Sequence, residues 1–165
     1  MGTEVERKYL VKLAEWRSQK AQLQSRSSNF GQKYCQGYIP THNGTTVRIR
    51  LIGDQGYLTI KSKTVGYTRA EFEYPIPASD AQSMLQNLCL KPLIEKIRYK
   101  IPIGNLTWEV DEFLGDNAGL IIAEVELENE QQQINLPSWI KREVNDKRYF
   151  NSYLVQHPYN KWENK

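Results

Sequence analysis

Residues 1–10 of the chain read MGTEVERKYL, and three charged residues, Glu4, Glu6 and Lys8, occupy alternate positions in this stretch. Successive side chains of a β-strand point to opposite faces, so in a strand these three residues share one face. Two carboxylates at this spacing can hold a divalent cation through hard oxygen ligands, and the lysine beside them can hold an anion. The solvated face of an edge strand has the same pattern, so the rest of the chain decides between the two interpretations.

The same alternation of charged and apolar residues recurs along the chain, in segments that are separated by Gly, Pro, Asn and Asp residues. These residues favour turns, and short turns between alternating segments are typical of antiparallel sheets. The pattern predicts about eight strands in a mainly β (α+β) fold. After the first strand, the expected strands span 32–39, 45–52, 57–63, 68–76, 93–101, 106–113 and 120–127.

Three segments have the residue types and capping patterns of short helices, at about 15–24, 80–89 and 149–156. Ser79 is the expected N-cap of the second helix, and residues 137–140 are expected to form a helical turn. The length and the absence of a linker-like segment predict one domain spanning 1–165, with a flexible polar tail at about 158–165.

Composition places the chain among ordinary globular proteins and excludes several classes. It has 165 residues, of which 39% are hydrophobic, and 22 basic and 19 acidic residues give a net charge of +3. This charge is too small to indicate nucleic-acid binding, and no segment approaches the roughly 18 apolar residues of a membrane span. Cys35 and Cys89 are far apart and form no CxxC motif, which favours a reducing compartment. We expect a cytoplasmic protein that binds neither nucleic acid nor membrane.

The helices determine which face of the sheet is inside. Their apolar stripes need a sheet surface to cover, and nearly every predicted strand offers one apolar and one charged face. If the helices pack outside on the apolar face, a closed eight-stranded antiparallel β-barrel has a charged interior. Its cavity would hold Glu4, Glu6, Lys8, Arg48, Arg50, Lys61, Lys63, Arg69, Glu71, Glu73, Lys96, Arg98, Glu109, Asp111, Glu124 and Glu126. The conventional alternative turns these charges towards water.

The charged positions are also segregated by sign, which favours the charged interior. Cationic pairs occupy 48/50, 61/63 and 96/98, and acidic pairs occupy 4/6, 71/73 and 124/126. Like charges two residues apart on one face repel each other, and a buried charge without a partner costs several kcal/mol. Such pairs are reasonable if the carboxylates hold a metal and the cations hold a polyanion. A polyphosphate with a divalent metal such as Mg²⁺ or Mn²⁺ suits both sets.

The charged strands, taken in chain order, resemble the CYTH superfamily, also called triphosphate tunnel metalloenzymes, and in length the small bacterial members of it. The motifs are ExExK at 4–8, RxR at 48–50, the lysine strand at 59–61, RxExE at 69–73, EKxR at 95–98, the acidic strands at 109–111 and 124–126, and DKRY at 146–149. One such motif alone would be weak, but the whole series covers nearly the entire chain. The resemblance implies an eight-stranded antiparallel tunnel that acts on triphosphates with a divalent metal.

The resemblance also implies roles for individual residues. Metal ligands would be Glu4, Glu6, Asp111, Glu124 and Glu126. Phosphates would be bound by Lys8, Arg48, Arg50, Lys61, Arg69, Lys96 and Arg98. Catalytic positions would be Glu71, Glu73, Asp111 and Glu124, with Lys147 capping one end of the tunnel from the C-terminal helix. Which of Glu71 and Glu73 serves the site stays open, as do the roles of Glu109, Lys63 and Lys100.

Among triphosphate enzymes, the first hypothesis is hydrolysis of inorganic tripolyphosphate to pyrophosphate and phosphate, with Mg²⁺ or Mn²⁺ as cofactor. The alternatives are a class IV-type adenylate cyclase or a thiamine or nucleoside triphosphatase, and a polyphosphate-binding module without catalytic activity. Phosphoryl transfer needs positioning and charge stabilisation more than a protein nucleophile, so no Ser or Cys triad is required. A homodimer is expected if few helices leave part of the apolar outer face uncovered.

Overall fold

The computed structural model describes residues 2–28 and 30–165, so Met1 of the predicted first strand lies outside the described residues. The described chain forms one nine-stranded antiparallel sheet in the order β5-β4-β3-β2-β6-β7-β8-β1-β9, and β5 also pairs with β1. The strands are β1 Gly2–Val11, β2 Gln32–Ile39, β3 Thr46–Ile52, β4 Gln55–Lys61, β5 Thr68–Ile76, β6 Ile94–Ile103, β7 Leu106–Phe113, β8 Ile121–Glu126 and β9 Ile140–Val144.

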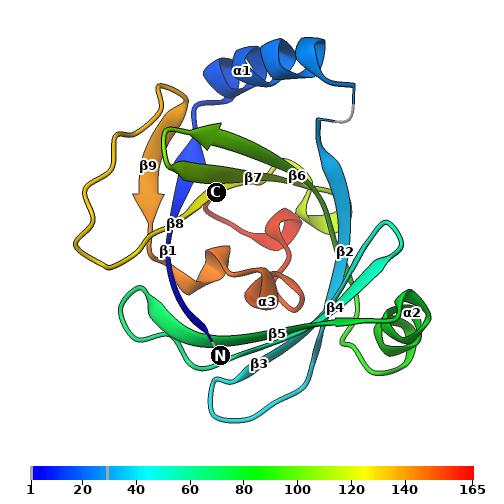
Figure 1. The fold of residues 1–165 in the computed structure, drawn as a ribbon. Coiled ribbons are helices and arrows are strands. Elements are labelled where there is room, and N and C mark those ends of the chain that lie inside the picture. The colour runs from blue at the N-terminus through cyan, green and yellow to red at the C-terminus, as the bar shows by residue number, and fades with distance from the viewer. Residues whose placement is uncertain (1, 29) are drawn as a thin grey trace.

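The pairing of β1 with β5 closes the first eight strands into a barrel. The N-terminal half of β1 pairs with β5, with Glu4 opposite Arg69. The same strand pairs along its other edge with β8, where Glu6 is opposite Glu126 and Lys8 is opposite Glu124. Figure 1 shows the resulting ring of strands from one end. The predicted closed, eight-stranded antiparallel barrel is confirmed.

The ninth strand was not predicted. Residues 137–140 form a hydrogen-bonded turn, in which Ile140 N donates to Pro137 O at 3.0 Å, and the chain then continues as β9, Ile140–Val144, which pairs with residues 8–11 of β1. The β1 backbone is free for this pairing because β5 begins at Thr68, opposite Val5, and so pairs only with residues 2–5 of β1. The short segment becomes a strand because it completes the hydrogen bonds of β1, a tertiary effect that local sequence does not show.

Two helices cover the apolar outer face, as predicted. Helix α1, Leu13–Arg26, buries Trp16 completely in a cluster that includes Trp139 and Tyr99. Helix α2, Ala78–Asn87, buries Ala81 and Leu85 in a cluster on the opposite side of the barrel (Figure 1). The prediction of Ser79 as its N-cap was wrong, because α2 begins two residues earlier than expected and Pro77 occupies the N-cap position.

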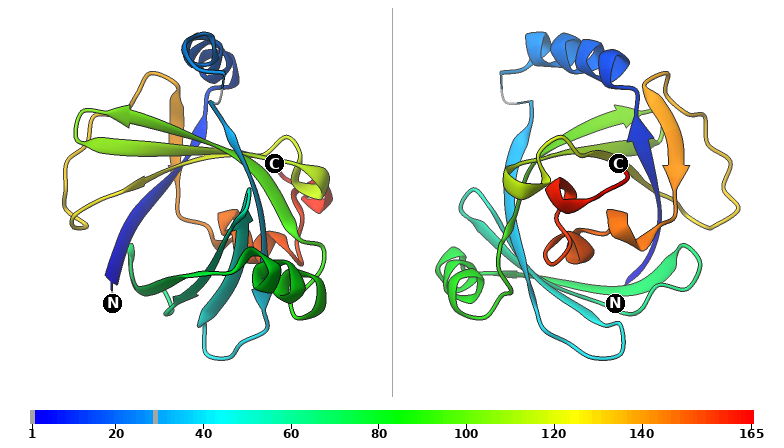
Figure 2. Two further views of the ribbon diagram at one scale, coloured as in Figure 1. Left: turned by 45° about the vertical axis from the view of Figure 1, so that its right-hand side comes forward. Right: turned by 180° about the vertical axis from the view of Figure 1, so that it is seen from behind.

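The third helix does not pack outside the barrel but closes one of its ends. The chain leaves β9, forms a 3₁₀ turn at Lys147–Tyr149 and then the short helix α3, Asn151–Leu154. These elements lie within the ring of strands in Figure 1 and are seen from behind in Figure 2. Tyr149, Leu154 and Val155 pack there against buried side chains near the ends of several strands. The predicted single helix at 149–156 is thus two shorter elements that form a cap.

The C-terminal tail is partly ordered against the barrel, and the two cysteines do not form a disulfide. The tail contains 3₁₀ helix Tyr159–Lys161, and both Tyr159 and Trp162 pack against the cluster beneath the cap. Its flexibility and the single domain spanning 1–165 stay predictions. Cys35 and Cys89 are both free thiols, as expected. Within the described ranges, no helix combines the length and the apolar character needed to cross a bilayer.

Candidate functional site

The barrel encloses a charged cavity of about 320 Å³. The residues that line it are Glu4, Glu6, Lys8, Tyr34, Tyr38, Thr46, Arg48, Arg50, Ile52, Tyr57, Lys61, Arg69, Glu71, Glu73, Lys96, Arg98, Lys100, Glu109, Glu124, Glu126, Phe150, Asn151 and Ser152. All of the predicted interior residues are among them except Lys63 and Asp111. Alternation places these side chains inside, because each strand turns every second residue towards the barrel axis.

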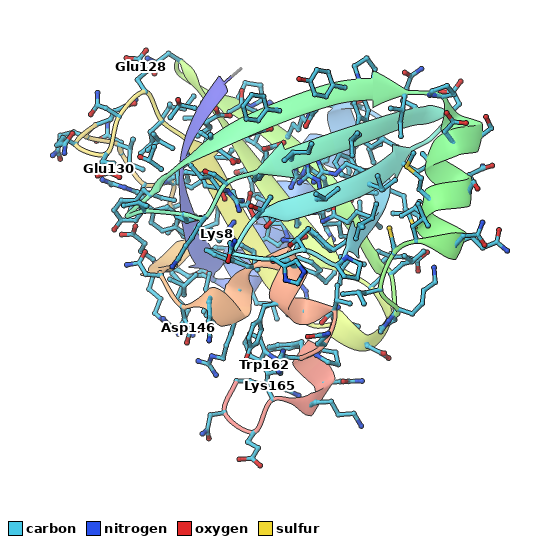
Figure 3. The ribbon with its side chains drawn as sticks, turned by 90° about the horizontal axis from the view of Figure 1, so that it is seen from below. Lys8, Glu128, Glu130, Asp146, Trp162 and Lys165 are labelled. Carbon is cyan, nitrogen blue, oxygen red and sulfur yellow. The ribbon has the colours of Figure 1, made fainter. Side chains whose placement is uncertain are left out.

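One side of the cavity carries a dense network of carboxylates and cations from β1 and its neighbours. Lys61 Nζ lies 2.8 Å from Glu4 Oε2, and Arg69 Nε lies 3.2 Å from the same oxygen. Lys8 Nζ lies 2.9 Å from both Glu6 Oε1 and Glu124 Oε1. Figure 3 shows Lys8 in the interior, close to the C-terminal segment. The network joins cation to anion on β1, β4, β5 and β8.

The carboxylates of this network crowd one another. Burial raises the pKa of Glu6, and the nearby Glu124 and Glu4 carboxylates raise it further. Burial also raises the pKa of Glu124, but Lys8, Arg98 and Lys96 outweigh burial and hold that pKa well below its usual range. Burial raises the pKa of Glu126, and the charges of Glu4, Glu71 and Glu6 add to the shift. Several negative charges therefore converge here.

The donor chemistry of this group fits a hard divalent cation. Mg²⁺ and Mn²⁺ prefer carboxylate oxygens, and a cation would relieve the repulsion that raises the pKa of Glu6. In the geometry of residues 2–28 and 30–165 the carboxylates bind lysine and arginine instead. No three His, Cys, Asp or Glu residues in these ranges are arranged around one point as metal ligands. A metal would thus have to draw the carboxylates away from their lysine partners.

Three further carboxylates lie at one mouth of the cavity. Glu71, Glu73 and Glu126 line both the cavity and an adjoining surface hollow next to Gly2 and Thr3. Glu73 has 41% of its side chain exposed, and its Oε2 accepts a 3.0 Å hydrogen bond from Thr59 Oγ1. Of the two alternatives that the sequence left open, Glu73 thus has the greater access to water, while both line the cavity.

The cations on β6 share one buried counterion. Asp111 on β7 is fully buried and accepts a bidentate pair of hydrogen bonds from Arg98, at 2.7 and 2.8 Å. Lys96 Nζ lies 2.7 Å from Asp111 Oδ2. Burial opposes the charge of Asp111, but Arg98 and Lys96 outweigh burial and lower its pKa to about 2. Asp111 is opposite Arg98 on the interior face but is covered by other side chains and does not line the cavity. This favours a role in positioning Lys96 and Arg98 over the predicted role as a ligand or catalytic group.

The cations on β3 lack a buried counterion. Arg50 is 8% exposed, and both its Nε and Nη2 donate to the neutral Gln36 Oε1, at 3.1 and 3.0 Å. Burial lowers the pKa of Arg50, and the charges of Arg48 and Arg98 lower it further. Arg48 donates to Thr59 Oγ1 and lies 3.5 Å from Glu73, while its buried Nε has no hydrogen-bond partner among the described residues. Arg50 thus faces the cavity without a carboxylate partner, and Arg48 has one only in the exposed Glu73.

The far end of the cavity is closed by residues that sequence analysis did not single out. Phe150, Asn151 and Ser152 line it from the cap, and the Phe150 ring lies 5.4 Å from Lys8 Nζ. Gln36 on β2 is fully buried and bonds to both Arg50 and the cap. Alternation in β2 could have indicated Gln36, since Tyr34 and Tyr38 on either side of it line the cavity. The cap residues carry no comparable signal.

Two predicted or open residues, Lys147 and Lys63, lie outside the cavity lining. Lys147 is exposed at the start of the cap, with its ammonium 5.8 Å from the Tyr153 ring, and is not among the lining residues. The cap is where the resemblance placed it, but Lys147 does not face the cavity. Lys63 is exposed beyond the end of β4, whereas Glu109 and Lys100 line the cavity with partial exposure.

Comparison with known proteins agrees with this architecture. The family model for the CYTH domain matches residues 2–153. An inorganic triphosphatase of Acetivibrio thermocellus is 46% identical over 160 residues, which span 96% of this chain and 97% of that protein. The crystal structure of another inorganic triphosphatase matches with a TM-score of 0.59 and 28% identity, covering 94% of this chain and 95% of that one.

A more distant structure shares the fold alone. The crystal structure of a candidate adenylate cyclase from Bacillus halodurans matches with a TM-score of 0.62, over 79% of this chain and 84% of that one, at 16% identity. The family match spans nearly all of the strands and the cap. The chain therefore belongs to the CYTH domain family.

Proposed function

We propose that this protein is a divalent-metal-dependent hydrolase of triphosphates, and that its substrate is inorganic tripolyphosphate, which it cleaves to pyrophosphate and phosphate. The observation that carries the proposal is the pair Arg48 and Arg50, two buried cations that face the cavity without a buried carboxylate partner: Arg50 bonds to the neutral Gln36, and Arg48 has only the exposed Glu73, 3.5 Å away. A buried positive charge of this kind is stabilised by an anion. The similarity to an inorganic triphosphatase at 46% identity supports the same substrate class.

The cations of the cavity bind and orient the substrate. Arg48 and Arg50 offer planar donor groups that match phosphate oxygens, and the unpartnered Nε of Arg48 would gain an acceptor. The other proposed phosphate-binding residues surround the same cavity: Lys8, Lys61, Arg69, Lys96 and Arg98. A chain of phosphates can reach all of these groups at once, because they line a single cavity and come from β1, β3, β4, β5 and β6.

Glu4, Glu6, Glu124 and Glu126 would hold the metal, for which Mg²⁺ and Mn²⁺ are the candidates. A bound divalent cation supplies positive charge to the phosphate oxygens and lowers the barrier to attack by water. Metal binding would free Lys8 and Lys61, which now contact these carboxylates, to bind phosphate. The ion pairs of this structure thus hold each carboxylate and each ammonium group near the position from which it would bind metal or phosphate.

Hydrolysis then needs a positioned water and a stabilised leaving group. Glu73, and with it Glu71, stands at the mouth, where a carboxylate can accept a hydrogen bond from the attacking water and orient it. Arg50, Lys96 and Arg98 stabilise the charge that develops on the pyrophosphate oxygens. The cap excludes bulk water from the other end. In this account the protein forms no covalent intermediate.

Product analysis tests the proposal against its alternatives. Tripolyphosphate and ATP are incubated separately with the protein and Mg²⁺ or Mn²⁺, and the products are identified by phosphorus NMR. We expect equal amounts of pyrophosphate and phosphate from tripolyphosphate. Cyclic AMP with pyrophosphate would indicate a cyclase, and ADP with phosphate a nucleoside triphosphatase. Tight binding of tripolyphosphate without turnover would indicate a polyphosphate-binding module. The homodimer, the cytoplasmic location and the absence of nucleic-acid and membrane partners stay predictions.

A further inference from the structure

The cap places a neutral residue, Asn151, among the cations of the cavity. Asn151 is the first residue of α3, and it lines the cavity between Phe150 and Ser152. Its Oδ1 accepts a 2.8 Å hydrogen bond from Lys96 Nζ and a 3.2 Å hydrogen bond from Gln36 Nε2. These bonds tie the cap to β6 and β2, on the wall that carries the proposed phosphate-binding residues.

The two donors fix which way the Asn151 amide faces. An ammonium group has hydrogen-bond donors only, so the atom facing Lys96 must be the oxygen of the amide. Lys96 is itself held by Asp111, 2.7 Å away, and is 1% exposed. Gln36 is fully buried and is held in turn by Arg50, which donates twice to its Oε1. An amide flip would place two N–H groups against these donors, so it is excluded.

The amide nitrogen of Asn151 therefore points away from Lys96 and Gln36. Within residues 2–28 and 30–165, no acceptor receives a hydrogen bond from Asn151 Nδ2, although the residue lines the cavity. Two polar N–H groups are thus available at the closed end of a site surrounded by cations. An anion with several oxygen atoms supplies the acceptors that they lack.

We propose that Asn151 binds the substrate directly, donating from Nδ2 to an oxygen of the phosphate group that lies nearest the cap. The proposal rests on the proposed function and deepens it, because it makes the cap part of the substrate site rather than a passive plug. A neutral donor adds a hydrogen bond to phosphate without adding charge to a group of cations that already repel one another. The cap then recognises the end of the polyphosphate chain.

Two substitutions at one position separate substrate contact from structural support. Asn151→Asp keeps an oxygen for Lys96 and Gln36 but replaces the N–H donors with a negative charge facing phosphate. Asn151→Ala removes the oxygen as well, so Lys96 loses one of its two partners. A purely structural role predicts that the alanine variant is the worse and the aspartate variant nearly normal. Substrate contact predicts the reverse order for binding.

The experiment measures tripolyphosphate affinity by calorimetry in chelator, the Michaelis constant and kcat with Mg²⁺, and the melting temperature. Asn160→Asp is the matched control, since it adds the same charge at an exposed site of the same C-terminal segment, away from the cavity lining. We expect Asn151→Asp to weaken binding about tenfold or more, Asn151→Ala to weaken it less, and Asn160→Asp to leave it unchanged. The melting temperature of Asn151→Asp should match that of the wild type.

The outcomes are distinct. Wild-type affinity in a folded Asn151→Asp variant, or an affinity loss confined to Asn151→Ala, would overturn the role of Asn151 and leave the proposed function intact. If the aspartate variant does not fold, a wild-type affinity in Asn151→Ala overturns the inference by itself. Failure of the wild-type protein to bind tripolyphosphate at all would overturn the proposed function and this inference together.

Discussion

Strands β3 and β6 lie on either side of β2, and each presents two cations, two residues apart, to the same cavity. The β6 pair, Lys96 and Arg98, shares the buried Asp111, and both distances to it are 2.7 Å. The β3 pair has no buried equivalent: Arg50 bonds to the neutral Gln36, and Arg48 lies 3.5 Å from Glu73, which is 41% exposed. Burial opposes the charge of Arg98, yet Asp111 raises its pKa well above the usual value, whereas burial lowers the pKa of Arg50 to about 9 and that of Lys96, which shares Asp111 with Arg98, to about 7.

The same sequence pattern thus has two physical meanings. Arg98, with its bidentate bond to Asp111, is part of the framework of the barrel, because that pair is close to neutral before any ligand arrives. A buried cation without a buried carboxylate partner costs stability in the free protein and regains it when an anion binds. The difference identifies β3 as the strand on which the substrate depends most. Tyr34 stands between the two, with Arg50 and Arg98 each about 5 Å from its ring.

The largest effect that we expect is a loss of stability when the β6 cations lose their shared counterion. Asp111→Ala leaves Lys96 and Arg98 buried without their counterion, and the free energy of unfolding should fall by about 3–5 kcal/mol in urea denaturation. Glu109→Ala is the control, since Glu109 also contacts Arg98, at 3.1 Å, but is 31% exposed. Its loss should cost less than about 1 kcal/mol. Equal stability of the two variants would contradict the framework role of Asp111.

Removing a β3 cation should have the opposite effect: it should lower the activity but not the stability of the protein. Arg50→Ala eliminates an uncompensated buried charge, so the free protein should be as stable as the wild type or more stable. Its kcat/KM for tripolyphosphate should fall about 100-fold, which corresponds to the loss of a buried charged contact to the substrate. Steady-state kinetics and urea denaturation measure the two quantities on one preparation. A variant with unchanged kinetics would show that Arg50 does not contact the substrate.

Binding of tripolyphosphate should restore the free energy of unfolding that the buried charges of Arg48 and Arg50 cost the free protein. At a tripolyphosphate concentration about 100 times the dissociation constant, the wild-type protein should gain about 2.7 kcal/mol of unfolding free energy. The gain is measured by thermal denaturation in chelator, so that no turnover occurs. At the same concentration Arg50→Ala should gain much less. An equal gain in both proteins would place the anion on other residues.

The smallest predicted effect concerns the shape of the β3 cations rather than their charge. Arg48→Lys keeps the charge but replaces the planar donor group, including the unpartnered Nε, with a single ammonium. We expect an increase of about tenfold in the Michaelis constant for tripolyphosphate, with little change in kcat. Lys61→Arg is the converse control, at a position where Glu4 is already the partner. Wild-type kinetics in Arg48→Lys would show that charge alone suffices at this position.

The barrel and most of its lining were predictable because both follow from a period of two residues. On β1, β3, β4, β5, β6 and β8 the alternation placed the charged side chains inside, and the helices placed the apolar face outside. The burial of Asp111 behind the wall was not predictable, because alternation gives the face of a strand and not the depth of a side chain.

The cap could not be derived from the pattern. Asn151 and Phe150 belong to a segment of 3₁₀ and α-helical turns that follows β9, and β9 pairs with the part of β1 that extends beyond its pairing with β5. Their roles arise from contacts between residues far apart in the chain, such as Asn151 with Lys96. Neutral residues also lack the alternation of charge from which the strands were predicted.

We propose that the charged cavity, in which Arg48 and Arg50 lack a buried counterion, hydrolyses an inorganic triphosphate. The most direct test of this proposal is the initial rate of phosphate release from tripolyphosphate, measured with Mg²⁺, with Mn²⁺ and with chelator, and repeated with ATP as competitor. We predict release that requires metal and that equimolar ATP inhibits only weakly. Release that persists in chelator, or consumption of ATP without hydrolysis of tripolyphosphate, would contradict the account.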